Sequence, residues 1–250
     1  MTQAAPRTRF NSAGLVRLLA ELAVAEVADP KQDFAARLGE WLDLKDALAL
    51  YSALHAIPPE PASRAMPAAF LRAELVRVRA ALTAGITADT AQSVGSALAL
   101  PTPLPSDTAE TAADFAPFHR YYVAHQRAMA ASIGPLRAAV RTALGRHSSA
   151  LRQLAGLDAV MEQALAAREA SLLATVPALL GKRFAHLHES HQRARDAAQA
   201  DDPARWMDPG GWLARFCVEL QRVLMAELEL RLMPVVGLLA ALETKSTELQ

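Results

Sequence analysis

Apolar residues recur every three or four positions along most of this 250-residue chain, which is the spacing of amphipathic α-helices. No stretch shows the strict alternation of apolar and polar residues typical of a strand, and β-branched and aromatic residues are sparse. The pattern predicts an all-α protein. We expect an N-terminal helical bundle, a long kinked helical hairpin and a long C-terminal helix with coiled-coil-like packing.

The pattern within residues 1–84 predicts an N-terminal segment of three helices. The first is expected to begin after Asn11 or Ser12, and the second at Asp29-Pro30, because aspartate caps a helix and proline suits its first position. A stiff turn at 57–61 precedes the third helix, residues 67–83. The apolar face of the second helix includes Leu48, and Tyr51 is a candidate for the same face. The apolar face of the third helix comprises Phe70, Leu71, Leu75, Val78 and Leu82.

Residues 85–110 interrupt the helical pattern. The stretch 100–106 is rich in proline and carries no charge, which favours an extended linker. A short helix is expected near residues 89–98. The linker divides the chain into an N-terminal segment and a C-terminal unit of residues 111–250.

The C-terminal unit carries apolar residues at an average spacing of 3.5, the coiled-coil repeat. We expect Gly134-Pro135 to kink the first long helix, and 145–148 to reverse the chain with Ser148 or Ser149 as the next cap. Pro177 is expected to kink the second long helix. The seam of the first helix runs through Phe115, Phe118, Tyr122, His125, Met129, Ser132, Leu136, Val140 and Ala143. That of the last helix runs through Leu213, Cys217, Leu220, Leu224, Leu228, Arg231, Val235, Leu238 and Leu242.

Charge and cysteine content narrow the class of protein. Lysine and arginine total 26, as do aspartate and glutamate, so no net charge draws the whole chain to nucleic acid or an anionic membrane. A single cysteine, Cys217, excludes an internal disulfide and is expected in the core. The N-terminal apolar run is broken by charges, and residues 232–242 are too short to span a bilayer. We expect a cytoplasmic protein without a transmembrane segment.

The sequence contains no glycine-rich phosphate loop, no Gly-x-Ser-x-Gly elbow, no Cys-x-x-Cys pair and no calcium loop, which favours a non-enzymatic protein without a cofactor. His188 and His191 are weak candidates for a metal pair because they lie one helical turn apart. The alternative, which we favour, is a polar helix face. His119, Tyr122 and His125 could exchange protons, but Tyr122 and His125 fall on the predicted seam.

Arginine is concentrated in one acid-free stretch, residues 116–157. Its members are Arg120, Arg127, Arg137, Arg141, Arg146 and Arg152. One hypothesis is a stripe that binds nucleic acid, anionic lipid or an acidic partner. The other, which we favour, is that these arginines pair with acids of the same protein, such as those of the N-terminal helices, because the chain as a whole is neutral.

Residues 201–217 hold two tryptophans, two Asp-Pro pairs and the Gly-Gly pair. Asp202-Pro203 predicts a one-turn helix that presents Trp206, and Asp208-Pro209 predicts the start of the last helix. Gly210 and Gly211 would then lie in its first turn and suggest a close approach of another group, with Trp206 or Trp212 as the candidate. Buried, the tryptophans would fix the last helix; exposed, they would anchor a partner.

Four segments resemble an uncharacterised family of proteobacterial proteins of about this length, treated as a domain of unknown function. They are residues 9–12, 34–43, 201–217 and 228–239. The resemblance supplies no catalytic residues. It implies genes that lie beside those of a motor-type proton channel of the MotA/ExbB class and an OmpA-like peptidoglycan-binding protein.

These observations predict a helical adaptor whose partner is a protein. The partner is either a second copy of the chain or a coiled-coil protein of the same envelope assembly. A metal-dependent enzyme using His188 and His191, and a nucleic-acid or lipid binder using the stretch from Arg120 to Arg152, are the alternatives.

Overall fold

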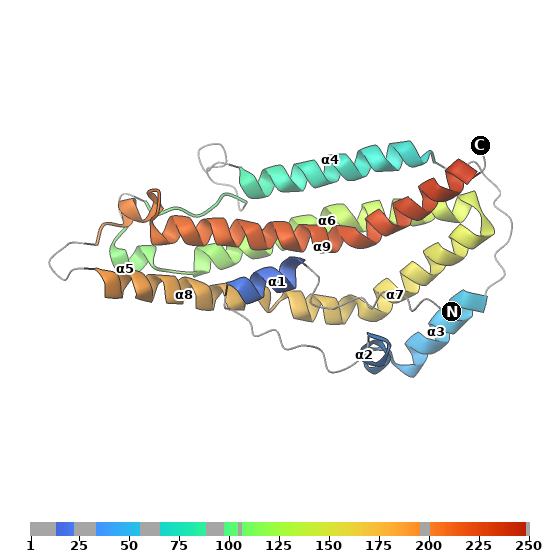
Figure 1. The fold of residues 1–250 in the computed structure, drawn as a ribbon, viewed down its shortest axis with the longest axis horizontal. Coiled ribbons are helices and arrows are strands. Elements are labelled where there is room, and N and C mark those ends of the chain that lie inside the picture. The colour runs from blue at the N-terminus through green and yellow to red at the C-terminus, as the bar shows by residue number, and fades with distance from the viewer. Residues whose placement is uncertain are drawn as a thin grey trace, which may run out of the picture.

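The computed structural model describes residues 14–22, 34–55, 66–88, 98–104, 107–195 and 201–248. Every regular element in those ranges is a helix, as the sequence predicts (Figure 1). In chain order they are α1 (Gly14–Glu21), α2 (Phe34–Trp41), α3 (Leu44–His55), α4 (Ala68–Thr87), α5 (Ala109–Ala112), α6 (Ala116–His147), α7 (Ser149–Leu173), α8 (Val176–Ala194), the 3₁₀ helix η3 (Pro203–Met207) and α9 (Trp212–Glu248). The predicted caps at Asn11, Ser12 and Asp29, the turn at 57–61 and most of the helix predicted at 89–98 lie outside the described residues.

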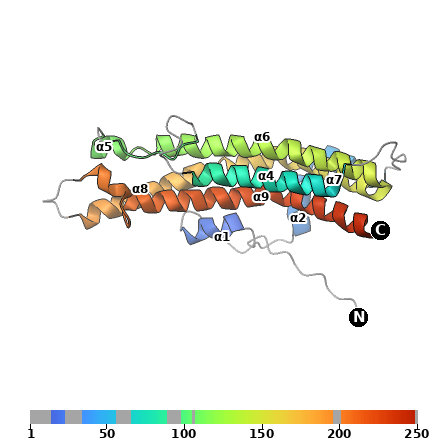
Figure 2. The same ribbon diagram turned by 90° about the horizontal axis from the view of Figure 1, so that it is seen from above.

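The 37-residue helix α9 is the centre of an elongated bundle. Helices α1, α4, α6 and α8 all pack against it, and the two views show them running along its length (Figures 1 and 2). Every member of the predicted α9 seam is buried except Arg231, which is partly buried. The 3.5-residue period explains this arrangement, because it keeps one row of side chains facing neighbouring helices over many turns.

The long hairpin of α6 and α7 reverses over a single residue. Ser148 adopts an extended conformation, and its hydroxyl accepts a hydrogen bond of 3.3 Å from the Leu151 N–H. Ser148 is therefore the cap, as predicted. Residues 145–147 continue α6, so the reversal predicted across them is wrong, because the serine cap alone turns the chain.

The break between α7 and α8 lies at Ala174 and Thr175, just before Pro177. Proline has no N–H to donate, so it fits the first turn of a helix better than its interior. Here Pro177 occupies the first turn of α8. The kink predicted at Pro177 is thus a break that falls two residues earlier.

Two helices stand where the sequence predicts one N-terminal helix. The helix is interrupted at Leu42. At the start of α3, the Asp46 N–H donates a 2.7 Å hydrogen bond to Asp43 Oδ1. Helix α3 packs on α7 with its opposite face, so Leu48 and Tyr51 are 60% and 62% exposed. Their predicted place in the core is therefore wrong. Phe70 at the start of α4 is also exposed, whereas the other four apolar residues predicted for that helix are buried.

Within the described residues, one stretch, Ser149–Ala194, is long and apolar enough by length and composition to cross a membrane, although the helix is interrupted at Ala174 and Thr175. It comprises α7 and α8, and 22% of its most apolar part is buried inside the chain. One such helix is weak support for a membrane span, so location and membrane contact stay predictions.

Candidate functional site

The tryptophans of the 201–217 segment are buried where α8, η3 and α9 meet. Trp206 is 2% exposed and Trp212 is 7% exposed, and their ring centroids lie 5.0 Å apart. Phe184 meets Trp212 edge to face at 5.1 Å, and His188 lies 5.2 Å from the same ring. Contacts of this kind add to the free energy gained from burial alone. Of the two alternatives for this pair, the structure shows the buried one: the tryptophans fix α9 against α8.

The carboxylate of Asp201 links the side chains at this junction of α8, η3 and α9. Its Oδ1 accepts a 2.8 Å hydrogen bond from the indole N–H of Trp206 and lies 3.1 Å from His191 Nε2. Its Oδ2 accepts a 2.6 Å bond from Gln192 and lies 2.9 Å from Arg195 Nη1. Burial raises the pKa of Asp201, but these hydrogen bonds outweigh burial and hold the pKa at about 2. The Asp201 carboxylate is therefore ionised, and its role is to hold the side chains around it in place.

Glycine permits the tight turn between η3 and α9. Gly210 has a φ of 88°, which side chains disfavour, and a Cβ on Gly211 would overlap the backbone carbonyl of Trp206. The predicted close approach is thus confirmed for Gly211, with Trp206 as the neighbour, whereas a Cβ on Gly210 would meet no atom within 4 Å. The predicted helix start at Asp208 is wrong, because residues 208–211 form a turn and α9 begins at Trp212.

The metal hypothesis requires a third ligand near His188 and His191. His191 contacts Asp201, and His188 Nε2 lies 3.2 Å from the Gln192 amide. No group of three or more histidine, cysteine, aspartate or glutamate side chains in the described ranges is placed to hold a metal ion. The two histidines instead belong to the buried contacts around Trp206, Trp212 and Asp201.

Two arginines of the 116–157 stretch form ion pairs inside the α6–α7 hairpin. Arg137 Nη2 contacts Asp158 Oδ1 at 2.6 Å, and Arg141 Nε contacts Asp158 Oδ2 at 2.6 Å, while both arginines also bind Glu162. Burial raises the pKa of Asp158, but hydrogen bonds from the two arginines lower it below its usual value. Internal pairing is therefore confirmed for Arg137 and Arg141. The acids come from α7, whereas the sequence suggested those of the N-terminal helices as examples.

The other arginines of the stretch are separated from this network. Arg120 and Arg127 are exposed on α6, and Arg152 Nε donates a 2.7 Å hydrogen bond to the Gly145 carbonyl. The six arginines therefore do not present one continuous basic surface.

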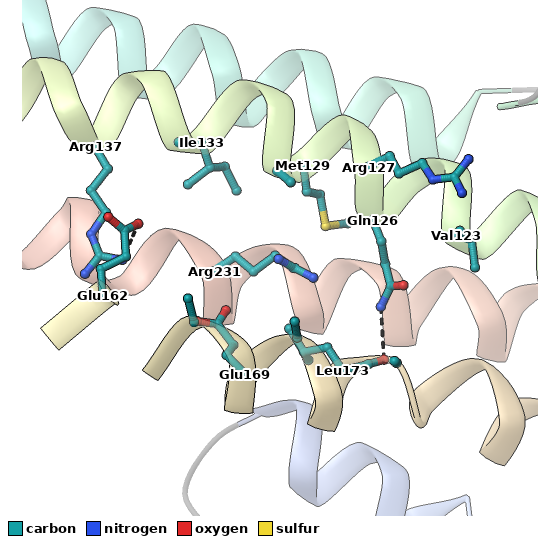
Figure 3. Close-up of a pocket in the computed structure, with 15 residues that line it drawn as sticks. Val123, Gln126, Arg127, Met129, Ile133, Arg137, Glu162, Glu169, Leu173 and Arg231 are labelled. Carbon is teal, nitrogen blue, oxygen red and sulfur yellow. Dashed lines mark hydrogen bonds and ion pairs between the residues drawn. The ribbon is translucent and has the colours of Figure 1, made fainter. Parts of the chain in front are cut away.

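A cavity of about 430 Å³ opens between α6 and α7, with Arg231 of α9 on its floor (Figure 3). Gln126 reaches across it and donates a 3.1 Å hydrogen bond to the Leu173 carbonyl. Below lies Glu227, which is fully buried and accepts hydrogen bonds from Tyr122 at 2.7 Å, Gln126 at 3.0 Å and Arg231 at 2.8 Å.

This buried network offers no reactive group. Burial raises the pKa of the Tyr122 phenol far above its usual value, and the Glu227 carboxylate raises it further. Burial also lowers the pKa of His125 to about 4, with a smaller opposing effect from the backbone of Leu98. Tyr122 bonds to Glu227 and His125 packs on Tyr121, with ring centroids 4.5 Å apart. The proposed proton exchange between Tyr122 and His125 therefore has no geometric support.

Burial also raises the pKa of Cys217 to about 12, so its thiol acts as a small apolar group in the core, as predicted.

A second buried ion pair was not predicted: Arg183 of α8 contacts Glu219 of α9 at 2.7 Å. The sequence signal for both missed acids, Glu219 and Glu227, is their position beside the seam of α9, where an acid requires a buried partner.

An exposed apolar row on α3 is the surface that the sequence did not predict. We define the α3 stripe as Leu44, Leu48, Tyr51 and Leu54, which are 77%, 60%, 62% and 50% exposed. Their spacing of four, three and three places them on one side of the helix. The stripe itself contains no charged residue. Large apolar and aromatic side chains without charge are typical of the centre of a protein interface.

The fold and its surfaces define an elongated all-helical bundle whose buried acids, Glu219 and Glu227, are paired within the chain and whose clearest open feature is an apolar helix face. The chain belongs to the family described as "Protein of unknown function (DUF3348)", whose match covers residues 1–244. Neither the curated proteins nor the solved structures contain a match to it.

Proposed function

We propose that this protein is a non-enzymatic helical adaptor that binds another protein through the α3 stripe. The observation that carries the proposal is the exposure of four large apolar side chains in one uncharged row. Contiguous exposed apolar surface commonly marks a site of protein or membrane contact. The i, i+4, i+7, i+10 spacing is that of a helix face that packs on another helix.

The way in which the buried polar side chains are held supports the same function. The candidates for chemistry, Asp201, Tyr122, His125 and Cys217, are held by hydrogen bonds or by apolar burial. An adaptor needs a rigid frame that presents a surface, and these groups supply the frame. We further propose a cytoplasmic setting beside an envelope-spanning proton channel and an OmpA-like protein, which is the setting that the family resemblance implies.

The test compares tagged variants as baits in native cells. Leu48→Glu places a charge in the middle of the stripe, where desolvating it on binding is costly. Val76→Glu is the matched control, because Val76 is 61% exposed on α4, far from the stripe. We expect the wild-type chain and Val76→Glu to recover one protein in stoichiometric amount, and Leu48→Glu to lose it.

Recovery of that protein by Leu48→Glu at the wild-type level would overturn the assignment of the stripe. Recovery of no stoichiometric protein by the wild-type chain would overturn the adaptor function itself. Far-UV circular dichroism and the urea midpoint of each variant confirm that all three baits are folded.

A further inference from the structure

A second apolar surface lies on the other side of the bundle. We define the α4/α6 groove as the cleft of about 560 Å³ between those two helices. Leu71, Val78 and Leu136 are buried at its base, and Met66 and Phe70 stand at its edge, 42% and 59% exposed.

The charges in the groove cancel each other. Among the described residues that line it, the ionised side chains are Glu74 and Arg77, and Arg77 Nε donates a 2.8 Å hydrogen bond to Glu74. A cleft with this lining favours an occupant whose entering face is apolar and uncharged. The α3 stripe has that chemistry.

The two surfaces are similar in length. The α3 stripe runs over ten positions, from Leu44 to Leu54, which is about 15 Å at about 1.5 Å per residue and fits within the groove. Phe70 and Leu82 mark the groove on α4 and lie twelve positions apart, which corresponds to about 18 Å. An amphipathic helix laid in an apolar groove is a recurrent mode of recognition.

The stripe and the groove cannot meet within one molecule. Helix α4 lies along one side of the long helices, whereas α3 packs on α7 at the other side (Figure 1). We therefore propose that the α3 stripe of one copy binds in the α4/α6 groove of a second copy. This inference rests on the proposed function, because it names the partner of the α3 stripe.

Because the stripe and the groove lie on opposite sides of the bundle, a pair of copies cannot form both contacts at once, so each bound copy still presents a free stripe or a free groove. Contacts of this kind build rings or open chains and do not stop at a two-fold dimer. A three-turn helix in a groove buries roughly 1,000 Å² or less in total, at the low end for specific interfaces. We expect reversible association that grows with concentration and changes little with salt, because no charges pair across it.

The experiment uses the full chain and two variants that each destroy one surface. Leu48→Glu blocks the stripe and leaves the groove intact, and Phe70→Glu blocks the groove and leaves the stripe intact. Sedimentation velocity follows each protein from about 5 to about 500 μM, a range suited to micromolar Kd values. We expect the wild-type chain to form dimers and larger species, and each variant alone to stay monomeric.

An equimolar mixture of the two variants is the decisive sample. The intact stripe of Phe70→Glu can enter the intact groove of Leu48→Glu, so the mixture should form a 1:1 dimer that grows no further. Val76→Glu, on the other side of α4 and as exposed as Phe70, should assemble like the wild-type chain.

Three outcomes would overturn the inference. A monomeric wild-type chain at every concentration removes self-association, and dimers of Phe70→Glu alone indicate that stripe binds stripe. A mixture of variants that stays monomeric shows that the two surfaces do not bind each other. None of these affects the adaptor proposal, which fails only if no stripe-dependent partner, the chain itself or another protein, is recovered.

Discussion

Tyr122 donates a 2.7 Å hydrogen bond to Glu227 across the centre of the bundle, where both side chains are fully buried. The bond joins α6 to α9 and, with Gln126 and Arg231, satisfies a carboxylate that water does not reach. A buried charge without its partners is strongly destabilising. Four measurements test whether the buried polar groups act as the structure indicates.

Replacing Tyr122 with Phe should lower the free energy of unfolding by about 1–3 kcal/mol, because Glu227 loses a donor that nothing replaces. Urea unfolding followed by circular dichroism measures the change. Tyr51→Phe is the matched control, since the phenol of Tyr51 belongs to a side chain that is 62% exposed. Equal midpoints for the two variants would show that the Tyr122 hydroxyl contributes nothing.

His125 should make the fold sensitive to mild acid. Burial lowers its pKa from about 6.5 to about 4, so the unfolded chain binds a proton that the folded chain rejects. The resulting stability is complete above pH 6.5 and is lost as the pH falls towards 4, by about 3 kcal/mol in total. Urea midpoints of the wild-type chain and His125→Leu between pH 7 and pH 4 should therefore converge or cross as the pH falls. Parallel curves would contradict this assignment.

Asp201 should make the stability of the fold depend on pH in a more acidic range than His125 does. Its pKa falls from about 3.8 to about 2 on folding, so its contribution is complete above pH 4 and is lost as the pH falls through 2. We expect Asp201→Asn to be less stable than the wild-type chain by about 2 kcal/mol at pH 6, and the difference to shrink between pH 4 and pH 2. Thermal unfolding of both proteins across that range measures it. A difference that does not change with pH would assign the loss to geometry alone.

Gly211 should tolerate no side chain. Gly211→Ala places a methyl group on the Trp206 carbonyl and should cost more than about 2 kcal/mol, because backbone must move. Gly156→Ala is the control, since a Cβ there meets no atom within 4 Å and alanine favours a helix by about 0.5–1 kcal/mol. The first variant should unfold at lower urea than the wild-type chain and the second at the same or higher urea. The reverse order would contradict the packing at this turn.

The sequence predicts the frame better than the surfaces. The 3.5-residue period identifies the seam of α9 almost residue by residue, because periodic burial is a local property that spacing records. The Ser148 cap and the one-turn helix of Asp202-Pro203 follow from local backbone chemistry in the same way. These features need no knowledge of which helix lies next to which.

The rest depends on contacts between distant parts of the chain. Leu48 and Phe70 have the apolar character and spacing of core residues, but the sequence alone does not say that α7 meets the other face of α3. Nor does it pair Arg137 with Asp158, or place Glu227 beneath Tyr122, 105 positions away. Acids beside an apolar seam indicate buried partners without naming them.

The central position of α9 also orders events during synthesis. Helices α1, α4, α6 and α8 bury their apolar faces on a helix that the ribosome makes after all of them. At about 5–20 residues per second, the side chains of α1 wait about 10–40 s before the start of α9 emerges. During that time the faces that α1, α4, α6 and α8 turn towards α9 lie uncovered, although α6 can already pack on α4 and α7, and the synthesis of α9 completes the core of the bundle.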